Sequence, residues 1–315
     1  LYKMSIFKLD PAFKDYIWGG TRLRDEYGKK CDYDKVAESW ELSCHKDGPS
    51  VVADGEYKGL TLNEYIEKAG KGVLGKNCER FENFPILIKL IDAKDNLSVQ
   101  VHPDNDYAMR VEGEYGKTEM WYVVDCDEGA TLLYGFKHEI TKEEFARRIA
   151  DNTLLEVTNA VPVKKGDVFF IKSGTLHAIG KGILIAEIQQ NSNTTYRIYD
   201  YGRVGKDGKP RELHVDKALD VTKLAPAEQY PETPVEKKDG YDIKLLSKCE
   251  YFTTYRVNVE TKAELDADEN SFNSILVLEG EPVISGGETV SAKKGESVFI
   301  SAGTGKGSRS DCFGA

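Results

Sequence analysis

Two stretches of the chain match: Val163-Lys164-Lys165-Gly166-Asp167-Val168-Phe169-Phe170-Ile171 and Ala292-Lys293-Lys294-Gly295-Glu296-Ser297-Val298-Phe299-Ile300. In each, a turn with a central glycine precedes an apolar run, and a second glycine follows the run, Gly174 in the first copy and Gly303 in the second. Turns of this kind separate the short strands of small antiparallel barrels. The repeat therefore predicts a duplicated β-barrel; coincidence between two Lys/Gly-rich turns is the alternative.

The two copies differ after the second glycine. The first copy has His177 there, and the second has Lys306. We therefore expect an active first barrel and a degenerate, structural second one. A stretch with three prolines and many charges lies between them, which is typical of a linker. The predicted division is residues 1–224 for N-terminal strands plus the active barrel, 225–240 for the linker and 241–315 for the C-terminal barrel.

Short strand signals dominate the remaining sequence. Six β-branched or aromatic runs are bounded by Gly, Asp, Asn or Lys: Val51–Val52, Ile86–Ile91, Met120–Val124, Ala130–Tyr134, Val168–Lys172 and Ile183–Ile188. Helix signals are limited to Thr61–Ala69 and Thr141–Ala150, and the second has Thr141 and Glu144 at the spacing of a capping box. The pattern predicts a mainly β fold with a few short helices.

The composition is that of an ordinary globular protein. The 315 residues are 40% hydrophobic and 30% charged, and the formal net charge is −10. This negative charge argues against nucleic acid and an anionic membrane surface as partners. No run approaches the roughly 20 apolar residues that span a bilayer, and no signal peptide is visible before the first strand-like run, for which Met4 is the expected natural start. We expect a cytoplasmic protein whose six scattered cysteines stay reduced.

One predicted strand carries two polar side chains on the same face. In the run Leu97-Ser98-Val99-Gln100-Val101-His102-Pro103-Asp104, alternation places Gln100 and His102 on one side and valines on the other. Pro103 ends the strand directly after His102, which places the pair at the rim of a barrel. Two ligands separated by one residue on a strand can reach the same metal ion.

Two further residues complete a candidate metal site. Glu119 enters the next strand in the run Gly116–Trp121, and His177 follows a Gly-Thr-Leu turn after another strand. Two imidazoles, one carboxylate and one amide oxygen make a nitrogen and oxygen site without thiolate. Such a set suits zinc and also tolerates manganese, cobalt or iron. Taken singly, each histidine is more often a satisfied core or surface residue.

The other three histidines are predicted to be structural or solvated. His45 follows a Ser-Cys pair at a strand end, His138 sits in a charged turn, and His214 lies near Arg211. His214 has an alternative role, because Arg203, shortly before it in the chain, could approach an anionic ligand.

Six segments carry a resemblance to a known family. They are Tyr16–Gly20, Glu38–Ser43, Leu97–Asp104, Gly116–Trp121, Ser173–Ala178 and Asn191–Arg197. In combination, the motifs QVHPD, KTE and GTLHA within them are similar to those of the type I mannose-6-phosphate isomerases (phosphomannose isomerases) of the cupin superfamily. The chain length and the run Gln189–Arg197 resemble the short bacterial branch. The resemblance implies two cupin-like (jelly-roll) barrels around a shared core, with a metal site in the first only.

The family's functional residues carry over onto matching positions of this chain. The zinc ligands, for one zinc ion per chain, fall on Gln100, His102, Glu119 and His177. The pocket residues fall on Trp18, Lys117, Glu187 and Arg197.

Three departures from the family pattern are visible. Many relatives carry Asp where this chain has Asn193, which weakens any mechanism that requires an acid at this position. Some relatives carry Tyr where this chain has Ile179, a neutral pocket change. The second copy also stops soon after Ser308-Arg309-Ser310-Asp311, so the final strands of that barrel are expected to be missing or altered.

The resemblance implies a zinc-dependent aldose–ketose isomerase, a monomer or weak homodimer, that interconverts mannose 6-phosphate and fructose 6-phosphate through a cis-enediol(ate). This reaction needs a proton carrier near C1 and C2 and stabilisation of a negative oxygen. Lys117 is the expected proton shuttle, and Arg197 stabilises the enediolate or grips the phosphate. Each of these roles has a structural alternative. Lys117 could be a solvated charge at a strand end, and Arg197 could be a salt-bridge partner. Trp18 could stack on the sugar or simply close one end of the barrel.

Three other functions stay open. An iron or manganese oxygenase on the same barrel would use three histidines plus glutamate, or a His/His/carboxylate face, against which Gln100 argues. A sugar-phosphate sensor would keep the metal pocket but would not require a titratable Lys117 beside it. A purely structural barrel would have no use for four convergent ligands.

Overall fold

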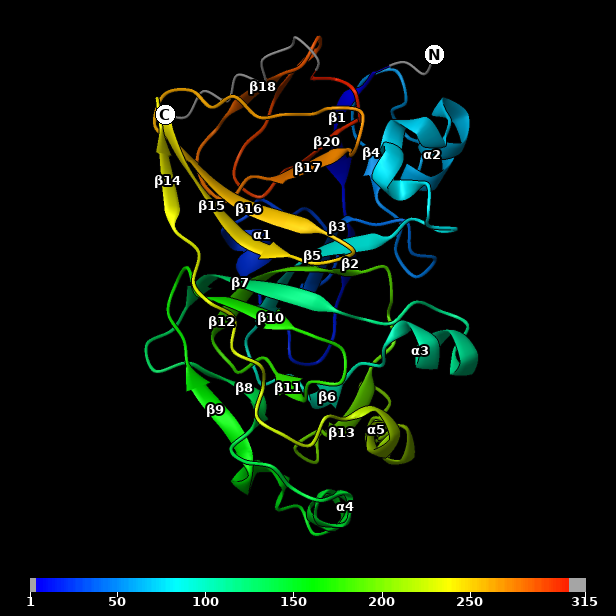
Figure 1. Cartoon of the computed structure of the whole chain (residues 1–315), viewed down its shortest axis with the longest axis vertical. Coiled ribbons are helices and arrows are strands. Elements are labelled where there is room, and N and C mark those ends of the chain that lie inside the picture. Colours follow the sequence, from blue (N-terminus) through cyan, green and yellow to red (C-terminus); the bar gives the residue numbers. More distant parts are fainter. Residues whose placement is uncertain (1–3, 306–315) are drawn as a thin grey trace.

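The computed structural model describes residues 4–305, and this part of the chain is mainly β (Figure 1). Within it, twenty strands form five sheets in which every strand pair is antiparallel. The predicted mainly β fold with a few short helices is confirmed. None of the helices described is long and apolar enough to be a membrane span.

Two large sheets form the half of the molecule that contains the site. The six-stranded sheet has the order β10 (Val168–Ile171), β7 (Glu119–Cys126), β12 (Ile183–Gln190), β5 (Ile86–Ala93), β3 (Glu38–Leu42) and β2 (Ala12–Lys14). The five-stranded sheet has the order β13 (Tyr196–Tyr199), β6 (Val99–Val101), β11 (His177–Ala178), β8 (Thr131–Phe136) and β9 (Thr158–Pro162).

Three smaller sheets form the other half. The four-stranded sheet has the order β17 (Asn273–Leu276), β20 (Ser297–Ile300), β1 (Ile6–Asp10) and β4 (Val51–Val52). The three-stranded sheet contains β14 (Val235–Lys238), β15 (Tyr241–Lys248) and β16 (Thr253–Val259), and the last pair is β18 (Val283–Ser285) with β19 (Thr289–Ser291).

Helices are short and lie at the periphery. The α-helices are α1 (Arg22–Asp25), α2 (Leu62–Ala69), α3 (Asn105–Val111), α4 (Lys142–Ala150) and α5 (Val215–Val221), and the 3₁₀ turns are η1 (Lys71–Leu74), η2 (Lys76–Cys78) and η3 (Leu154–Glu156). Thr61 caps α2 in a complete capping box with Glu64. Thr141 caps α4 as predicted, but Glu144 bonds to Arg148 and does not close the box.

The six-stranded sheet is buried on both faces. All eight residues of β5 and all eight of β12 are buried. On one face, Ile86 and Ile88 pack against Phe7 of β1 and against helix α2. On the other face, Ile91 packs toward the five-stranded sheet. A strand covered on both faces reads as a continuous apolar run, which is why both strands are visible in the sequence.

The five-stranded sheet is also covered on both faces. Its inner side contributes Leu132 to the cluster that contains Val123 of β7. Its outer side packs Phe136 against Phe145 of α4 and Ala218 of α5. Figure 1 shows both helices in the lower half of the molecule, with α5 beside β13 and α4 at the lower end. The space between the two large sheets is therefore shielded from solvent by structure on either side.

The first strand of the chain joins the last strands. β1 pairs with β20 in a register that places Ile6 opposite Ile300, and β17 pairs with the other edge of β20. In Figure 1 these strands lie together in the upper half. Residues 6–10 thus share a sheet with the C-terminal strands β17 and β20 as well as with β4. The division into 1–224, 225–240 and 241–315 stays a prediction, and β14 begins inside the predicted linker.

The described cysteines form no disulfide: Cys31, Cys44, Cys78, Cys126 and Cys249 are free thiols. Three sequence features lie outside the described residues: Lys306, the run Ser308–Asp311 and Cys312.

Candidate metal centre

The five-stranded sheet presents a row of polar side chains to the space between the two large sheets. His177 of β11 lies opposite Gln100 of β6, and Gln100 lies opposite Arg197 of β13. Directly opposed residues of antiparallel strands have their side chains on the same face. His102, two residues after Gln100, continues this face at the end of β6.

The six-stranded sheet presents a second polar row. Glu187 of β12 lies opposite Trp121 of β7 on one side and Lys89 of β5 on the other. Glu119, two residues before Trp121, occupies the same face of β7. Lys89, Glu119 and Glu187 are all buried, with Glu119 at 0% exposure. Buried charges are costly unless they are paired, so this concentration of them indicates a functional site.

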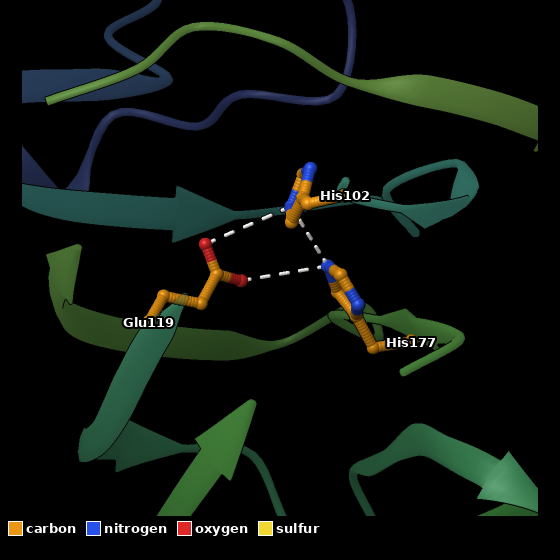
Figure 2. Close-up of side chains that lie close together, drawn as sticks. All are labelled: His102, Glu119 and His177. Carbon is orange, nitrogen blue, oxygen red and sulfur yellow. Dashed lines mark hydrogen bonds and ion pairs between the residues drawn. The ribbon is translucent and has the colours of Figure 1, made fainter. Parts of the chain in front are cut away.

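Three side chains from the two sheets converge. Figure 2 shows His102, Glu119 and His177 pointing toward one another. His102 Nε2 and His177 Nε2 lie 3.1 Å apart. Glu119 Oε2 is 3.7 Å from His102 Nε2, and Glu119 Oε1 is 3.4 Å from His177 Nε2. One ligand atom of each residue lies within 4.8 Å of the other two, which suits a single divalent cation.

Backbone carbonyls set the tautomer of both histidines. His102 Nδ1 lies 2.9 Å from the carbonyl oxygen of Thr194, and His177 Nδ1 lies 2.8 Å from that of Thr175. Because a carbonyl only accepts hydrogen bonds, each Nδ1 carries the proton and each Nε2 presents a lone pair. Burial lowers the pKa of His177 to about 4 and that of His102 well below its ordinary value. Two lone pairs therefore face each other, an arrangement that a bound cation stabilises.

Lys117 lies inside this cluster. Its Nζ donates to Glu119 Oε2 at 2.5 Å and to His102 Nε2 at 3.0 Å. Its side chain is buried, which does not fit the alternative of a solvated strand-end charge. Glu119 Oε1 is buried and has no hydrogen-bond partner among residues 4–305. A buried carboxylate oxygen without a donor fits a metal ligand, because an ion would satisfy it.

A chain of buried charges extends from the cluster along the six-stranded sheet. Lys117 Nζ is 3.7 Å from Glu187 Oε1, and Lys89 Nζ lies 3.8 Å from the same oxygen and 3.4 Å from Glu38 Oε2. The indole of Trp121 donates to Glu187 Oε2 at 2.8 Å. Sequence reasoning missed Lys89. The available signal was a single lysine in the middle of the apolar strand Ile86–Ala93.

The two central carboxylates differ in their electrostatic surroundings. Burial and the charge of Glu187 raise the pKa of Glu119 above its ordinary value. Burial alone would also raise the pKa of Glu187, but the ammonium groups of Lys117 and Lys89 hold it below its ordinary value. Glu187 is therefore the more firmly ionised of the two, and it compensates the two lysine charges.

Gln100 lies at the edge of the cluster. Its Nε2 is 3.5 Å from His177 Nε2, and its Oε1 accepts a hydrogen bond from Ser98 Oγ at 3.2 Å. A rotation of the amide by 180° exchanges its oxygen and nitrogen at nearly the same positions. Gln100 is thus placed to offer an oxygen to the point between the two imidazoles.

Arg197 is an arginine without a carboxylate partner within residues 4–305. Its Nη1 donates to the carbonyl oxygen of Glu212 at 2.9 Å, and its buried Nε has no partner. The neighbouring carboxylate of Asp200 is occupied by Arg203 and Arg211, at 2.6 and 2.7 Å. Burial and the charge of Arg211 lower the pKa of the Arg197 guanidinium. The geometry does not fit the salt-bridge alternative for Arg197.

Trp18 lies in the apolar cluster between the two large sheets. Its side chain is 3% exposed and packs in the same cluster as Ala37, Ile91 and Ile179. This burial favours the plug alternative over stacking on a sugar. Ile179, where some relatives carry tyrosine, is 2% exposed and contributes only apolar surface.

The remaining sequence candidates lie elsewhere. His138 bonds to the backbone of Glu139 on the surface, and His214 Nδ1 accepts a hydrogen bond from the backbone of Arg197. His45 is buried and pairs with the carboxylate of Glu114. These three histidines are outside the cluster of ligand atoms, which is the one group of its kind in residues 4–305.

Comparisons with known proteins identify the family of this chain. The profile of the phosphomannose isomerase type I catalytic domain matches residues 6–129, and that of the mannose-6-phosphate isomerase cupin domain matches residues 242–308. The mannose-6-phosphate isomerase ManA of Bacillus subtilis is 41% identical over 298 residues, which cover 94% of this chain and 93% of the relative. The mannose-6-phosphate isomerase of Streptococcus mutans is 40% identical over 90% of this chain and 88% of its own.

Solved structures show the same fold. The crystal structure of the mannose 6-phosphate isomerase from Bacillus subtilis superposes with a TM-score of 0.92 at 38% identity, covering 99% of this chain and 97% of that one. The zinc-bound form of another mannose 6-phosphate isomerase superposes with a TM-score of 0.71 at 19% identity, over 99% and 97% of the two chains. The chain belongs to the type I mannose-6-phosphate isomerases and is an enzyme of that family.

Proposed function

We propose that this enzyme interconverts mannose 6-phosphate and fructose 6-phosphate through a cis-enediol(ate) and depends on one zinc ion per chain. The proposed ligands are Gln100, His102, Glu119 and His177. The observation that carries the proposal is the pair of deprotonated Nε2 atoms 3.1 Å apart, beside Glu119 Oε1, which has no hydrogen-bond partner in the described part of the chain. The lone pair of His102 Nε2 accepts from the Lys117 ammonium at 3.0 Å, and that of His177 Nε2 lies 3.5 Å from the Gln100 amide, whereas one cation between the imidazoles would bind both lone pairs.

The chemistry of the ligands favours zinc. Neutral imidazoles with Nδ1 bonded to carbonyl oxygens are the common form of histidine ligands to zinc, and a carboxylate and an amide oxygen complete a tetrahedral set. When bound, the ion supplies Lewis acidity that polarises a substrate carbonyl. Thiolate ligands play no part.

Lys117 is proposed to move the proton between C2 and C1. Its Nζ contacts both Glu119 and His102, and it is also within 3.7 Å of Glu187. A substrate whose C1 and C2 approach the ligand cluster would therefore have a proton carrier at hydrogen-bond distance. Burial of the cluster excludes water, which protects an enediol(ate) from side reactions.

Arg197 is proposed to bind an anionic oxygen of the substrate. Its buried Nε has no hydrogen-bond partner within the described range 4–305, and the nearby carboxylate of Asp200 is already shared by two other arginines. The positive charge of Arg197 is thus available to an enediolate or a phosphate group. An Arg197→Lys variant separates the two roles: loss confined to kcat supports enediolate stabilisation, and a rise confined to KM supports phosphate binding.

The decisive experiment measures metal content and isomerisation together. Purified protein is analysed for metal by mass spectrometry and assayed for fructose 6-phosphate formed from mannose 6-phosphate, before and after chelation. About one zinc per chain, with activity lost on chelation and restored by zinc, is the expected result. Bound metal without turnover would support the sensor alternative, oxygen consumption would support the oxygenase, and absence of any metal would refute the ligand assignment.

A further inference from the structure

The imidazole of His102 depends on a backbone carbonyl for its orientation. Its Nδ1 donates to the oxygen of Thr194 at 2.9 Å, which directs Nε2 toward His177 and Glu119. Thr194 lies in the irregular segment 191–195, between β12 and β13. Irregular segments have no ladder of backbone hydrogen bonds, so other groups must hold this carbonyl in place.

One carboxylate binds three successive residues of this segment. Glu114 Oε2 accepts from Thr194 Oγ1 at 2.8 Å, from the backbone N–H of Asn193 at 3.2 Å and from Ser192 Oγ at 3.4 Å. Ser192 Oγ in turn accepts from the backbone N–H of Thr194 at 3.1 Å. Glu114 therefore holds Thr194 and the two residues before it, and so the backbone that leads to the carbonyl that bonds His102.

The second oxygen of Glu114 is bound by a buried histidine. His45 Nε2 bonds to Glu114 Oε1, and His45 Nδ1 accepts from the backbone N–H of Asp47 at 3.1 Å. Because Nδ1 accepts, Nε2 carries the proton and donates to the carboxylate. The side chain of His45 is 5% exposed and packs edge-on against Trp40 of the six-stranded sheet, with ring centroids 5.7 Å apart.

The amide of Asn193 completes this arrangement. Its Nδ2 donates to Asp47 Oδ2 at 3.0 Å. An ionised aspartate at this position would place a carboxylate against Asp47 and close to Glu114, and it would have no donor to offer. The departure from the family pattern at Asn193 is thus explained by a neighbouring carboxylate.

We propose that Glu114 and His45 are positioning residues for the metal centre, acting on His102 through the carbonyl of Thr194. This inference rests on the proposed zinc site. Groups that orient a metal-bound histidine change metal affinity by about 10- to 100-fold when they are removed. Sequence spacing gives no hint of this role, because Glu114 acts on residues that follow it by about eighty positions.

Zinc affinity is the direct test, measured by competition with a chromogenic chelator. The Glu114→Ala variant removes all three contacts and should bind zinc about 10- to 100-fold more weakly than the wild type. The Glu114→Gln variant keeps an acceptor for the segment 192–194 but opposes its amide N–H to that of His45, so its affinity should lie in between. The Thr194→Val variant removes one contact at nearly constant shape and should lose only a few-fold.

The control is Glu112→Ala, in the same segment of the chain. Glu112 has similar side-chain exposure, 26% against 25% for Glu114, but its carboxylate bonds to Tyr196 and Lys217. This variant should lower the apo-protein unfolding temperature without changing zinc affinity. If Glu114→Ala does not fold, Glu114→Gln and Thr194→Val carry the test.

The outcomes separate this inference from the proposed function. A wild type that binds zinc, with an affinity that falls in the order Thr194→Val, Glu114→Gln and Glu114→Ala, supports the inference. Wild-type affinity in all three variants would overturn it and leave the zinc enzyme intact, as would an equal loss in Glu112→Ala. A wild type that binds no zinc would overturn both.

Discussion

The turn before β10 and the turn before β20 are closed by the same hydrogen bonds. In the first, the backbone N–H of Lys164 donates to Asp167 Oδ2 at 2.9 Å; in the second, that of Lys293 donates to Glu296 Oε2 at 2.9 Å. The central glycines have φ values of +91° and +89°. The N–H of each glycine also donates to a valine carbonyl at 2.8 Å, that of Val123 in β7 and that of Val277 directly after β17. The two copies are thus the same backbone unit.

The strands beyond these turns have different neighbours in the two copies. β10 pairs with β7 in a register that places Ile171 opposite Glu119, and the chain then returns as β11 with His177. β20 pairs with β1 and β17, and its neighbours offer no comparable set, because the group of metal-ligand side chains in residues 4–305 is that of the first copy alone. The chain also has no histidine after His214. The duplicated turn precedes a strand in both copies. Within the described part of the chain, only in the first copy do the neighbouring strands carry the side chains that could bind a metal ion.

The largest expected effect on turnover comes from removing the charge of one proposed metal ligand, Glu119, while the fold is kept. In Glu119→Gln, the charge that complements a divalent cation is lost, so zinc should bind more weakly and turnover should fall by about 1,000-fold or more. Metal analysis, the isomerase assay and thermal unfolding of the apo-protein check this together. As a control, Glu296→Gln changes a glutamate in the turn of the second copy, away from the metal-ligand cluster, and should leave turnover unaltered. Full activity of Glu119→Gln at full zinc occupancy contradicts the ligand assignment.

The next effect separates proton transfer from metal binding. In Lys117→Met, an apolar chain of similar length replaces the ammonium, so kcat should fall by about 100- to 10,000-fold while zinc stays bound. The control is Lys164→Met, which alters an 84%-exposed side chain in the first turn. Steady-state kinetics with metal analysis check the prediction. If kcat of Lys117→Met falls only two- or three-fold, Lys117 does not transfer the proton.

Stability of the two turns should differ when a Cβ is added. At Gly166 an added Cβ meets no atom within 4 Å, so Gly166→Ala carries only the strain of a positive φ, about 1–2 kcal/mol. At Gly295 the added Cβ lies 2.2 Å from the carbonyl oxygen of Tyr27, so the backbone must also shift, and the total should be about 3 kcal/mol or more. Urea unfolding midpoints compare the two variants. An equal loss of unfolding free energy in the two variants would mean that the Tyr27 carbonyl does not restrict the turn at Gly295.

The smallest effect should come from the carboxylates that close the turns. Asp167→Ala and Glu296→Ala each remove one bond to a backbone N–H at a partly exposed site, with side-chain exposures of 19% and 30%. Each should therefore lower the free energy of unfolding by about 1 kcal/mol, and the two values should agree within about 0.5 kcal/mol. Denaturant titration of both variants measures this. A clear difference would show that the copies are not equivalent even at the turn.

Local sequence rules predicted a large part of the fold. The strands Ile86–Ile91 and Ile183–Ile188 can be recognised because they are buried on both faces and are therefore apolar apart from Lys89 and Glu187. Alternation on a single strand was enough to place Gln100 and His102 on one face, since that rule needs no knowledge of neighbouring strands. The cap of α4 at Thr141 followed from a four-residue pattern.

Other features were inaccessible because they depend on pairing between distant segments. Lys89 became a site residue only through the register that sets it opposite Glu187. The pairing of β1 with β20 joins the two ends of the described chain, and no local pattern in the residues Ile6–Asp10 indicates a partner. Glu114 acquired its role through the fold of the segment 192–194.

The sequence by itself determined the class of fold, the turn chemistry of the two copies and, through the motifs around His102, Glu119 and His177, the membership of the family. These properties depend on residues that are adjacent in sequence, so period-two alternation and turn preferences are enough to find them. Tertiary structure alone decided which buried charges meet, that Arg197 lacks a carboxylate partner within residues 4–305, and which carbonyl orients His102. Strand register and loop docking are set by the sum of many long-range contacts, and no single stretch of sequence contains that sum.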